Sequence, residues 1–217
     1  MIKAVIFDMD GLLIDTELLQ SKSFELLIRS YDKKPIFQEN GLIHDIGTKG
    51  NIQRIIIEKH GIKGSVESLT KKRRRFYRQL LEKTQVKIMP GGKKLLEILK
   101  KKNLKLAIAS NAYANFVNIL IKRVNLEKYF DAIVTIDDVL KPKPFPDLYL
   151  ETAKKLKVKP KNCLVLEDSE AGVIAAKKAK MKVIAVPSKY TKHQDFSKAD
   201  KIVESLKNID LNLINSL

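Results

Sequence analysis

Short apolar runs alternate with helical patterns along most of this chain of 217 residues. The runs that we expect to form strands are Lys3–Phe7, Lys105–Ala109, Ala132–Ile136, Cys163–Leu166, Lys182–Val186 and Lys201–Val203. Between the second and the fifth of these runs lie the helical patterns Asn115–Lys122, Asp147–Lys157 and Glu170–Lys180. Apolar strands that alternate with helices are typical of a parallel sheet whose two faces are both covered. The sequence therefore predicts an α/β fold with helices on both faces of a parallel sheet.

One interval interrupts this alternation, because residues 16 to about 86 are helical in pattern throughout. Its three helical segments read LLQSKSFELLIRSY, NIQRIIIEKH and SVESLTKKRRRFYRQLLEKT, and proline and glycine residues separate them. A parallel sheet has no place for this stretch between its first two strands. We therefore expect an inserted α-helical cap at residues 16–87, with residues 1–15 and 88–217 forming the core domain.

The composition, with 44% hydrophobic residues, is that of a folded globular protein. The longest apolar runs are far too short to cross a bilayer. No export signal is readable, and the single cysteine, Cys163, fits a reducing compartment. These features lead us to expect a cytoplasmic protein that does not contact a membrane.

The chain is strongly basic, with 42 lysine and arginine residues against 25 acidic ones and a net charge of +17. Such a charge can attract nucleic acid or small anions. However, most lysines are spread along amphipathic helices, and the one concentrated run, Lys71 to Arg75, lacks the interleaved aromatic residues of a base-stacking surface. We therefore expect most of the lysines only to solvate the helices, and we keep nucleic-acid binding as the alternative from another class.

Polar residues follow the predicted strands at the point where each ends: Asp8, Asp10, Ser110, Asn111, Lys143, Glu167, Asp168 and Ser169. Each has a simpler explanation by itself, since Asp10 and Gly11 suit a turn, while Ser110 and Ser169 suit helix caps. In an open parallel sheet, however, ligands bind outside the carboxyl ends of the strands. Polar groups after four strands at that one edge therefore predict a single site.

The residue types at this edge indicate metal-assisted phosphoryl transfer. Carboxylates at close range resist ionising together, and a divalent cation relieves that repulsion. Oxygen ligands without a cluster of cysteine or histidine favour Mg²⁺ over Zn²⁺. Asp8 and Asp10, two residues apart on one side of an extended segment, can serve as nucleophile and as general acid and base. Lys143 and the Ser110 hydroxyl can balance the charge of the transferred group.

Four ordered motifs, FDMDGLLIDTE, SNA, KPFPD and LEDSEAGVIAA, resemble those of the haloacid dehalogenase superfamily, in the subgroup with a helical cap. The resemblance implies a Rossmann-like core and a Mg²⁺-dependent phosphatase that forms an aspartyl-phosphate on Asp8, with Asp10 as acid and base. It further implies that the phosphoryl group is held by Ser110, Asn111 and Lys143. The implied metal ligands are Asp8, the Asp10 backbone carbonyl and Asp168, with Glu167 assisting or ligating.

Asp10 separates the chain from true haloacid dehalogenases, which lack this second aspartate, and so favours phosphate chemistry. The β-phosphoglucomutases of this superfamily, which the chain also resembles, typically carry a histidine soon after the motif that holds Asp8 and Asp10. At that place this chain reads DTELLQSKS, with Gln20 and no histidine. We therefore expect hydrolysis by water and keep a sugar phosphomutase as the alternative.

The resemblance places substrate selection in the cap, with Gly47, Thr48, Lys49 and Arg73 as candidates; a solvated helix face remains the alternative for the arginine run. The expected substrate is a small phosphomonoester, either a sugar phosphate or a nucleotide-like one such as pseudouridine 5′-phosphate. We expect the protein to act as a monomer.

Overall fold

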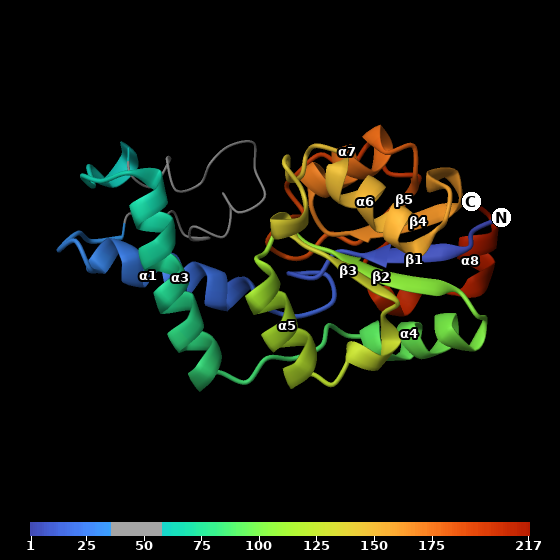
Figure 1. Cartoon of the computed structure of the whole chain (residues 1–217), viewed down its shortest axis with the longest axis horizontal. Helices are drawn as coiled ribbons and strands as arrows, with labels where there is room; N and C mark the ends of the chain where they lie inside the picture. The colour runs from blue at the N-terminus through green and yellow to red at the C-terminus, as the bar shows by residue number, and fades with distance from the viewer. Residues whose placement is uncertain (36–57) are drawn as a thin grey trace. The chain divides into compact units, whose positions relative to one another are not determined.

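A computed structural model of the chain describes residues 1–35 and 58–217 (Figure 1). It divides into two compact units. The first unit comprises Met1–Asp15 and Lys87–Leu217, and the second comprises Thr16–Val86. The first unit contains the whole β-sheet, so the residues that follow the strands belong to it.

The sheet has six parallel strands: β1 (Ala4–Phe7), β2 (Lys105–Ala109), β3 (Ala132–Val134), β4 (Cys163–Glu167), β5 (Lys182–Ala185) and β6 (Lys201–Ile202). Their order is β3-β2-β1-β4-β5-β6, which confirms the predicted α/β class. The order reverses direction between β1 and β4. In open α/β sheets, ligands bind outside the carboxyl ends of the strands at such a reversal.

The register of the central strands places three residues in one row at this reversal. Phe7 lies opposite Ile108 of β2 and Leu166 of β4. The next residue of each strand therefore falls at the same level, which aligns Asp8 with Ala109 and Glu167. The row lies at the carboxyl end of the sheet.

Five helices belong to the first unit: α4 (Gly92–Lys101), α5 (Ala114–Arg123), α6 (Asp147–Leu156), α7 (Glu170–Lys178) and α8 (Leu211–Asn215). Figure 1 shows α6 and α7 on one face of the sheet and α4 and α5 on the other. Alternate strand residues such as Ala4 and Ile6 form a core with Ala153 of α6 and Val173 of α7. Among the described residues, no helix is both long and apolar enough to cross a membrane.

The predicted third strand is too long at its carboxyl end. β3 stops at Val134 because Ile136–Asp138 forms a 3₁₀ turn. The Thr135 side chain accepts from the backbone of Asp138, and the Asp138 carboxylate accepts from the backbone of Thr135, so a capping box begins this turn directly after the strand. The other 3₁₀ turns among the described residues are Glu127–Tyr129, Pro160–Asn162 and Leu206–Asn208.

The second unit contains α1 (Glu17–Arg29) and α3 (Val66–Lys83), which pack against each other. Their shared core is apolar and buried: Phe24, Leu27, Ile28, Ile62 and Leu69. The side chain of Ser65 accepts from the Ser68 backbone N–H and caps α3. The predicted middle helix, Asn51–His60, lies mostly outside the described residues. That this unit acts as a cap stays a prediction.

Candidate active site

Asp8 is the first residue after β1, and the sheet holds its backbone. Its N–H donates to the Leu166 carbonyl at 3.0 Å, which continues the pairing between β1 and β4 beyond the strand itself. The residue is only 8% exposed. A run of four buried apolar residues thus delivers a carboxylate into a nearly closed environment.

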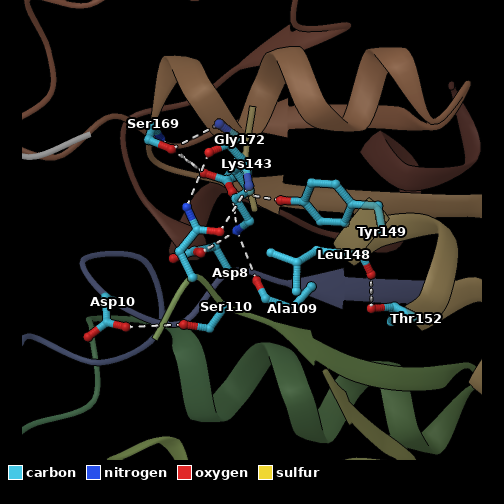
Figure 2. Close-up of polar contacts among 12 residues, drawn as sticks. Asp8, Asp10, Ala109, Ser110, Lys143, Leu148, Tyr149, Thr152, Ser169 and Gly172 are labelled. Atoms are coloured by element: carbon cyan, nitrogen blue, oxygen red, sulfur yellow. Dashed lines mark hydrogen bonds and ion pairs between the residues drawn. The ribbon is translucent and has the colours of Figure 1, made fainter. Parts of the chain in front are cut away.

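The ammonium group of Lys143 lies beside this carboxylate (Figure 2). Its Nζ is 2.5 Å from Asp8 Oδ1, 2.6 Å from Glu167 Oε1 and 2.9 Å from the Ala109 carbonyl oxygen. An ammonium group has three N–H donors, so these three acceptors satisfy it completely. They are the same three residues that the register aligns across β2, β1 and β4. Lys143 therefore joins the ends of three strands.

Two carboxylates share this one ammonium group, and the pKa of Asp8 reflects this imbalance. Burial raises the pKa of Asp8 to about 8; Lys143 opposes the rise and the negative charge of Glu167 adds to it. Burial alone would lower the pKa of Lys143, but the charges of Asp8 and Glu167 outweigh burial and raise it. The lysine thus stays charged, and ionisation of both carboxylates would leave more negative than positive charge, which favours binding of an additional cation.

Glu167 is fully buried and accepts hydrogen bonds at both carboxylate oxygens. Oε1 accepts from Lys143 and, at 2.6 Å, from the Tyr149 hydroxyl. Oε2 accepts from the Ser169 backbone N–H at 3.1 Å and from its hydroxyl at 2.9 Å. Burial, followed by the charges of Glu167 and Asp8, raises the pKa of Tyr149 well above its usual range, so its hydroxyl remains a donor.

Asn111 fixes the loop that carries Lys143. Its Oδ1 accepts from the Lys143 backbone N–H at 3.0 Å, and its Nδ2 donates to the Lys143 carbonyl at 3.4 Å. This pair of bonds ties the segment after β2 to a loop 32 residues further along the chain. Asn111 therefore positions the lysine backbone in this structure.

Asp10 and Ser110 form the other side of the site (Figure 2). The Ser110 hydroxyl donates to Asp10 Oδ2 at 3.3 Å and accepts from the Ala112 backbone N–H at 3.0 Å. Gly11 has a φ of 84°, which a residue with a side chain rarely adopts, and its N–H donates to the Ile14 carbonyl. The simple turn considered for Asp10 and Gly11 is thus present, and it directs the chain away from the strand end.

Ser110 does not cap α5, because the N-cap residue of this helix is Tyr113. Ser169 caps α7, because its hydroxyl accepts from the Gly172 backbone N–H at 3.1 Å at the start of that helix. The predicted helix cap is therefore confirmed for Ser169 but not for Ser110, whose hydroxyl bonds to Asp10.

The order of these residues, the parallel sheet and the lysine bridge agree with one protein family. The family model described as haloacid dehalogenase-like hydrolase matches residues 5–186. The chain belongs to this family. The resemblance drawn from the four motifs is confirmed.

Relatives of this haloacid dehalogenase-like hydrolase align with most of the chain. A phosphorylated carbohydrates phosphatase from Thermotoga maritima is 36% identical over 82% of this chain and 81% of its own length. A beta-phosphoglucomutase from Bacillus subtilis is 31% identical over 98% of this chain and 94% of its own length. The crystal structure of CbbY from Rhodobacter sphaeroides in complex with phosphate has a TM-score of 0.83 at 27% identity and covers 96% of each chain.

The donor set fits a magnesium ion. Among the described residues, no three Asp, Glu, His or Cys side chains form a ready-made metal cage. Mg²⁺, however, usually takes only one or two carboxylates and completes its shell with water and substrate phosphate. Asp8 and the 3% exposed Asp168 follow adjacent strands and would supply two carboxylates, in a cluster that has more carboxylates than ammonium groups. Glu167 already meets protein donors at both of its oxygens.

The predicted selectivity residues separate into two groups. Gly47, Thr48 and Lys49 lie outside the described residues. Arg73 lies in the second unit, where Nη1 donates to Gln20 Oε1 at 2.9 Å and to the Ser23 hydroxyl at 3.1 Å. Its guanidinium carbon is 4.5 Å from the centre of the Phe24 ring. Arg73 is therefore held between polar and aromatic groups rather than lying on a fully solvated face.

Two residues of the site were not predicted from the sequence. Tyr149 fits the apolar pattern of α6 and gave no signal apart from its hydroxyl. Gly172 is an isolated glycine inside the helical pattern EAGVIAA, which can indicate close approach of another group. A Cβ atom at Gly172 would lie 1.8 Å from Glu167 Oε1, so only glycine leaves room for this carboxylate.

Proposed function

We propose that this hydrolase is a Mg²⁺-dependent phosphatase that cleaves a small phosphomonoester through an aspartyl-phosphate on Asp8. The observation that carries the proposal is the buried Asp8 carboxylate held by Lys143 at the carboxyl end of β1. A carboxylate can be a nucleophile when it is ionised and its position is fixed. The phosphatase name of the Thermotoga maritima relative and the phosphate complex of CbbY support the same chemistry.

In the first half-reaction, an Asp8 oxygen attacks phosphorus while the bond from phosphorus to the ester oxygen breaks. Asp10 donates a proton to the departing oxygen, which leaves as an alcohol. Lys143 balances negative charge beside the transferred group, and Ser110 can donate to a phosphoryl oxygen. Asn111 contributes by holding the backbone of Lys143.

In the second half-reaction, Asp10, now a carboxylate, takes a proton from water. The water oxygen attacks phosphorus, the bond to Asp8 breaks, and inorganic phosphate and the starting carboxylate are released. When bound, Mg²⁺ would be held by Asp8, Asp168 and the Asp10 carbonyl and would neutralise charge on the phosphoryl group. Glu167 assists by holding Lys143, since Lys143, Tyr149 and Ser169 already donate to its oxygens.

The proposed substrate is a sugar phosphate or a nucleotide-like monoester such as pseudouridine 5′-phosphate. The name of the carbohydrate phosphatase relative favours the sugar phosphates. Arg73, with Gly47, Thr48 and Lys49, is proposed to select the substrate when the second unit closes as a cap and limits access of water. The protein is proposed to work in the cytoplasm as a monomer.

A sugar phosphomutase is the second candidate, because a beta-phosphoglucomutase is 31% identical along almost the whole chain. Against it, position 20 holds a glutamine whose Oε1 accepts from Arg73, and an amide does not exchange protons as histidine does. A mutase would isomerise a sugar phosphate when primed with a sugar bisphosphate and would release no net phosphate.

The direct test is p-nitrophenyl phosphate hydrolysis with Mg²⁺ and with chelator, using the wild type, Asp8→Asn and Asp10→Asn. The proposal predicts phosphate release that chelator abolishes, no turnover by Asp8→Asn and strongly reduced turnover by Asp10→Asn. An unchanged rate for Asp8→Asn would refute the covalent route. No phosphatase activity, together with steeply salt-dependent binding to DNA or RNA, would favour the nucleic-acid alternative.

A further inference from the structure

Tyr149 contacts the catalytic cluster from inside the core, although neither its position in a motif nor its residue type predicted a role. It is fully buried in α6 and packs in the core on the α6 and α7 face of the sheet. Figure 2 shows the ring extending from α6 toward Lys143. The hydroxyl donates to Glu167 Oε1 at 2.6 Å, and the ring centre is 5.1 Å from Lys143 Nζ. One side chain thus touches both ionised partners of the bridge.

The hydrogen bonds to Glu167 fix this carboxylate in one orientation. An ionised carboxylate has about four acceptor positions. Lys143 and Tyr149 occupy those of Oε1, and the N–H and hydroxyl of Ser169 occupy those of Oε2. Removal of any one donor leaves a buried, charged oxygen incompletely satisfied, so the carboxylate would turn toward its remaining donors.

The space around Glu167 allows little other movement. The backbone of Gly172 comes so close that an added Cβ would meet all three atoms of the carboxylate, at 1.8 to 2.3 Å. The α7 backbone therefore limits the carboxylate on one side, and the Tyr149 hydroxyl fixes Oε1. Lys143 bonds to this same oxygen, so the position of its ammonium group depends on where Oε1 is held.

We propose that Tyr149 is a positioning residue of the reaction: its hydroxyl holds Glu167 against Lys143 and thereby places the ammonium group beside Asp8. This inference rests on the proposed phosphatase function. Loss of the hydroxyl changes neither the charge of the cluster nor the residues that would contact substrate. Loss of the hydroxyl loosens Lys143. The charge of Lys143 stabilises the transition state, in which negative charge is being transferred, more than it stabilises the bound substrate.

The test compares Tyr149→Phe with Tyr129→Phe, a matched control whose hydroxyl also donates to a glutamate, Glu97, at 3.3 Å. We expect Tyr149→Phe to lower kcat for p-nitrophenyl phosphate about tenfold, since hydrogen bonds to charged groups are the strong ones, while KM stays within about twofold. Tyr129→Phe should leave both constants unchanged. An unchanged kcat in Tyr149→Phe would overturn the proposal.

A double-mutant cycle with Glu167→Ala, which removes both acceptor oxygens, shows whether Tyr149 acts through Glu167. If it does, adding Tyr149→Phe to Glu167→Ala lowers kcat by less than about twofold, because the connection is already broken. An equal tenfold loss in both backgrounds would assign the effect of Tyr149 to general packing of the core and would overturn the proposal.

A measurement independent of activity separates this inference from the proposed function. In protein labelled with ¹⁵N-lysine, the Lys143 ammonium signal is identified by its absence from Lys143→Met. We expect Tyr149→Phe to shift this signal and to speed its hydrogen exchange, while Tyr129→Phe leaves it in place. A wild type without phosphatase activity would refute the proposed function alone, whereas an unmoved signal in Tyr149→Phe would refute the positioning role.

Discussion

Two ionic clusters in the first unit use the same residue types at similar distances, but in opposite proportions. At the carboxyl end of β1, one lysine is shared by two carboxylates, and its side chain is only 4% exposed. Beside β5, Asp200 is shared by two lysines, Lys177 at 2.7 Å and Lys182 at 3.2 Å, whose side chains are 35% and 42% exposed. The first cluster has more carboxylates than lysines, and the second has more lysines than carboxylates.

Both clusters contain ion pairs of similar length, so the proposed catalytic site differs from the structural link in its burial and in its ratio of carboxylates to lysines. Asp200 also accepts from the Val183 backbone N–H at 2.9 Å, so it joins β5 to the segment before β6. The surplus positive charge of Lys177 and Lys182 is solvated and therefore costs little free energy. At Asp8 the surplus carboxylate is buried, so its ionisation is unfavourable unless a cation binds beside it, and the site favours a cation and the groups that the cation accompanies.

The largest effect is expected from removing the lysine of the buried cluster. Lys143→Met leaves two buried carboxylates without their shared cation, which should lower the free energy of unfolding by about 3–5 kcal/mol. Turnover should fall about 10²–10³-fold through lost charge stabilisation. The matched control Lys177→Met should cost at most about 1 kcal/mol and leave turnover unchanged. Urea unfolding and steady-state kinetics measure both quantities, and equal costs for the two variants would contradict the comparison.

A smaller effect should follow from filling the space beside Glu167. Gly172→Ala forces the Glu167 carboxylate away from a Cβ that would otherwise lie 1.8 Å from its oxygen. We expect a loss of about 1–3 kcal/mol from overpacking, and about 100-fold in kcat from displacement of Lys143.

Gly61→Ala is the control for this substitution, because Gly61 has a φ of +58° but no atom within 4 Å of its added Cβ. It should lose stability through backbone strain and keep the wild-type kcat. A Gly172→Ala protein with full activity would show that the Glu167 position is not required.

The smallest effects, taken per pH unit, are two pH dependences of opposite sign, measured without metal. Burial raises the pKa of Asp8 from 3.8 to about 8, so the folded state holds a proton that the unfolded state releases. The stability due to Asp8 is therefore complete below about pH 4 and declines as pH rises toward 8, by at most about 1.4 kcal/mol per pH unit.

For Asp200, burial would raise the pKa, but hydrogen bonds from Lys177, Val183 N–H and Lys182 outweigh burial and lower it. Its contribution is present above the unfolded value of 3.8 and is lost as pH falls through the lowered folded value. Chemical unfolding of the wild type, Asp8→Asn and Asp200→Asn across pH 3–9 gives both slopes. Slopes of the same sign would contradict the difference between the clusters.

The sequence was sufficient for the fold class because the alternation of apolar strands and helices leaves little choice. It also indicated which polar residues follow the strands. The row of Asp8, Ala109 and Glu167 could not be predicted, since it depends on β1 pairing with both β2 and β4. The end of β3 was misplaced because the capping box of Thr135 and Asp138 overrides an apolar run that continues to Ile136.

The supporting residues were hidden for a different reason. Tyr149 occupies a core position of an amphipathic helix. Its ring fits that apolar position, so the pattern gives no indication that its hydroxyl has a partner. That Asn111 holds phosphate stays a prediction; its two bonds to the backbone of Lys143 could not be predicted, because they depend on a loop that only the folded chain brings near. Long-range contacts of this kind leave no spacing pattern in the sequence.

The central claim is that the buried carboxylate of Asp8 is the nucleophile, and trapping its phosphorylated form tests this most directly. Wild-type protein with Mg²⁺ and a ³²P-labelled sugar phosphate is acid-quenched within milliseconds, digested and mapped by mass spectrometry. The account predicts label on the peptide that contains Asp8, formed no more slowly than turnover and absent from Asp8→Asn. Label on another residue, or phosphate release at the wild-type rate by Asp8→Asn, would contradict it.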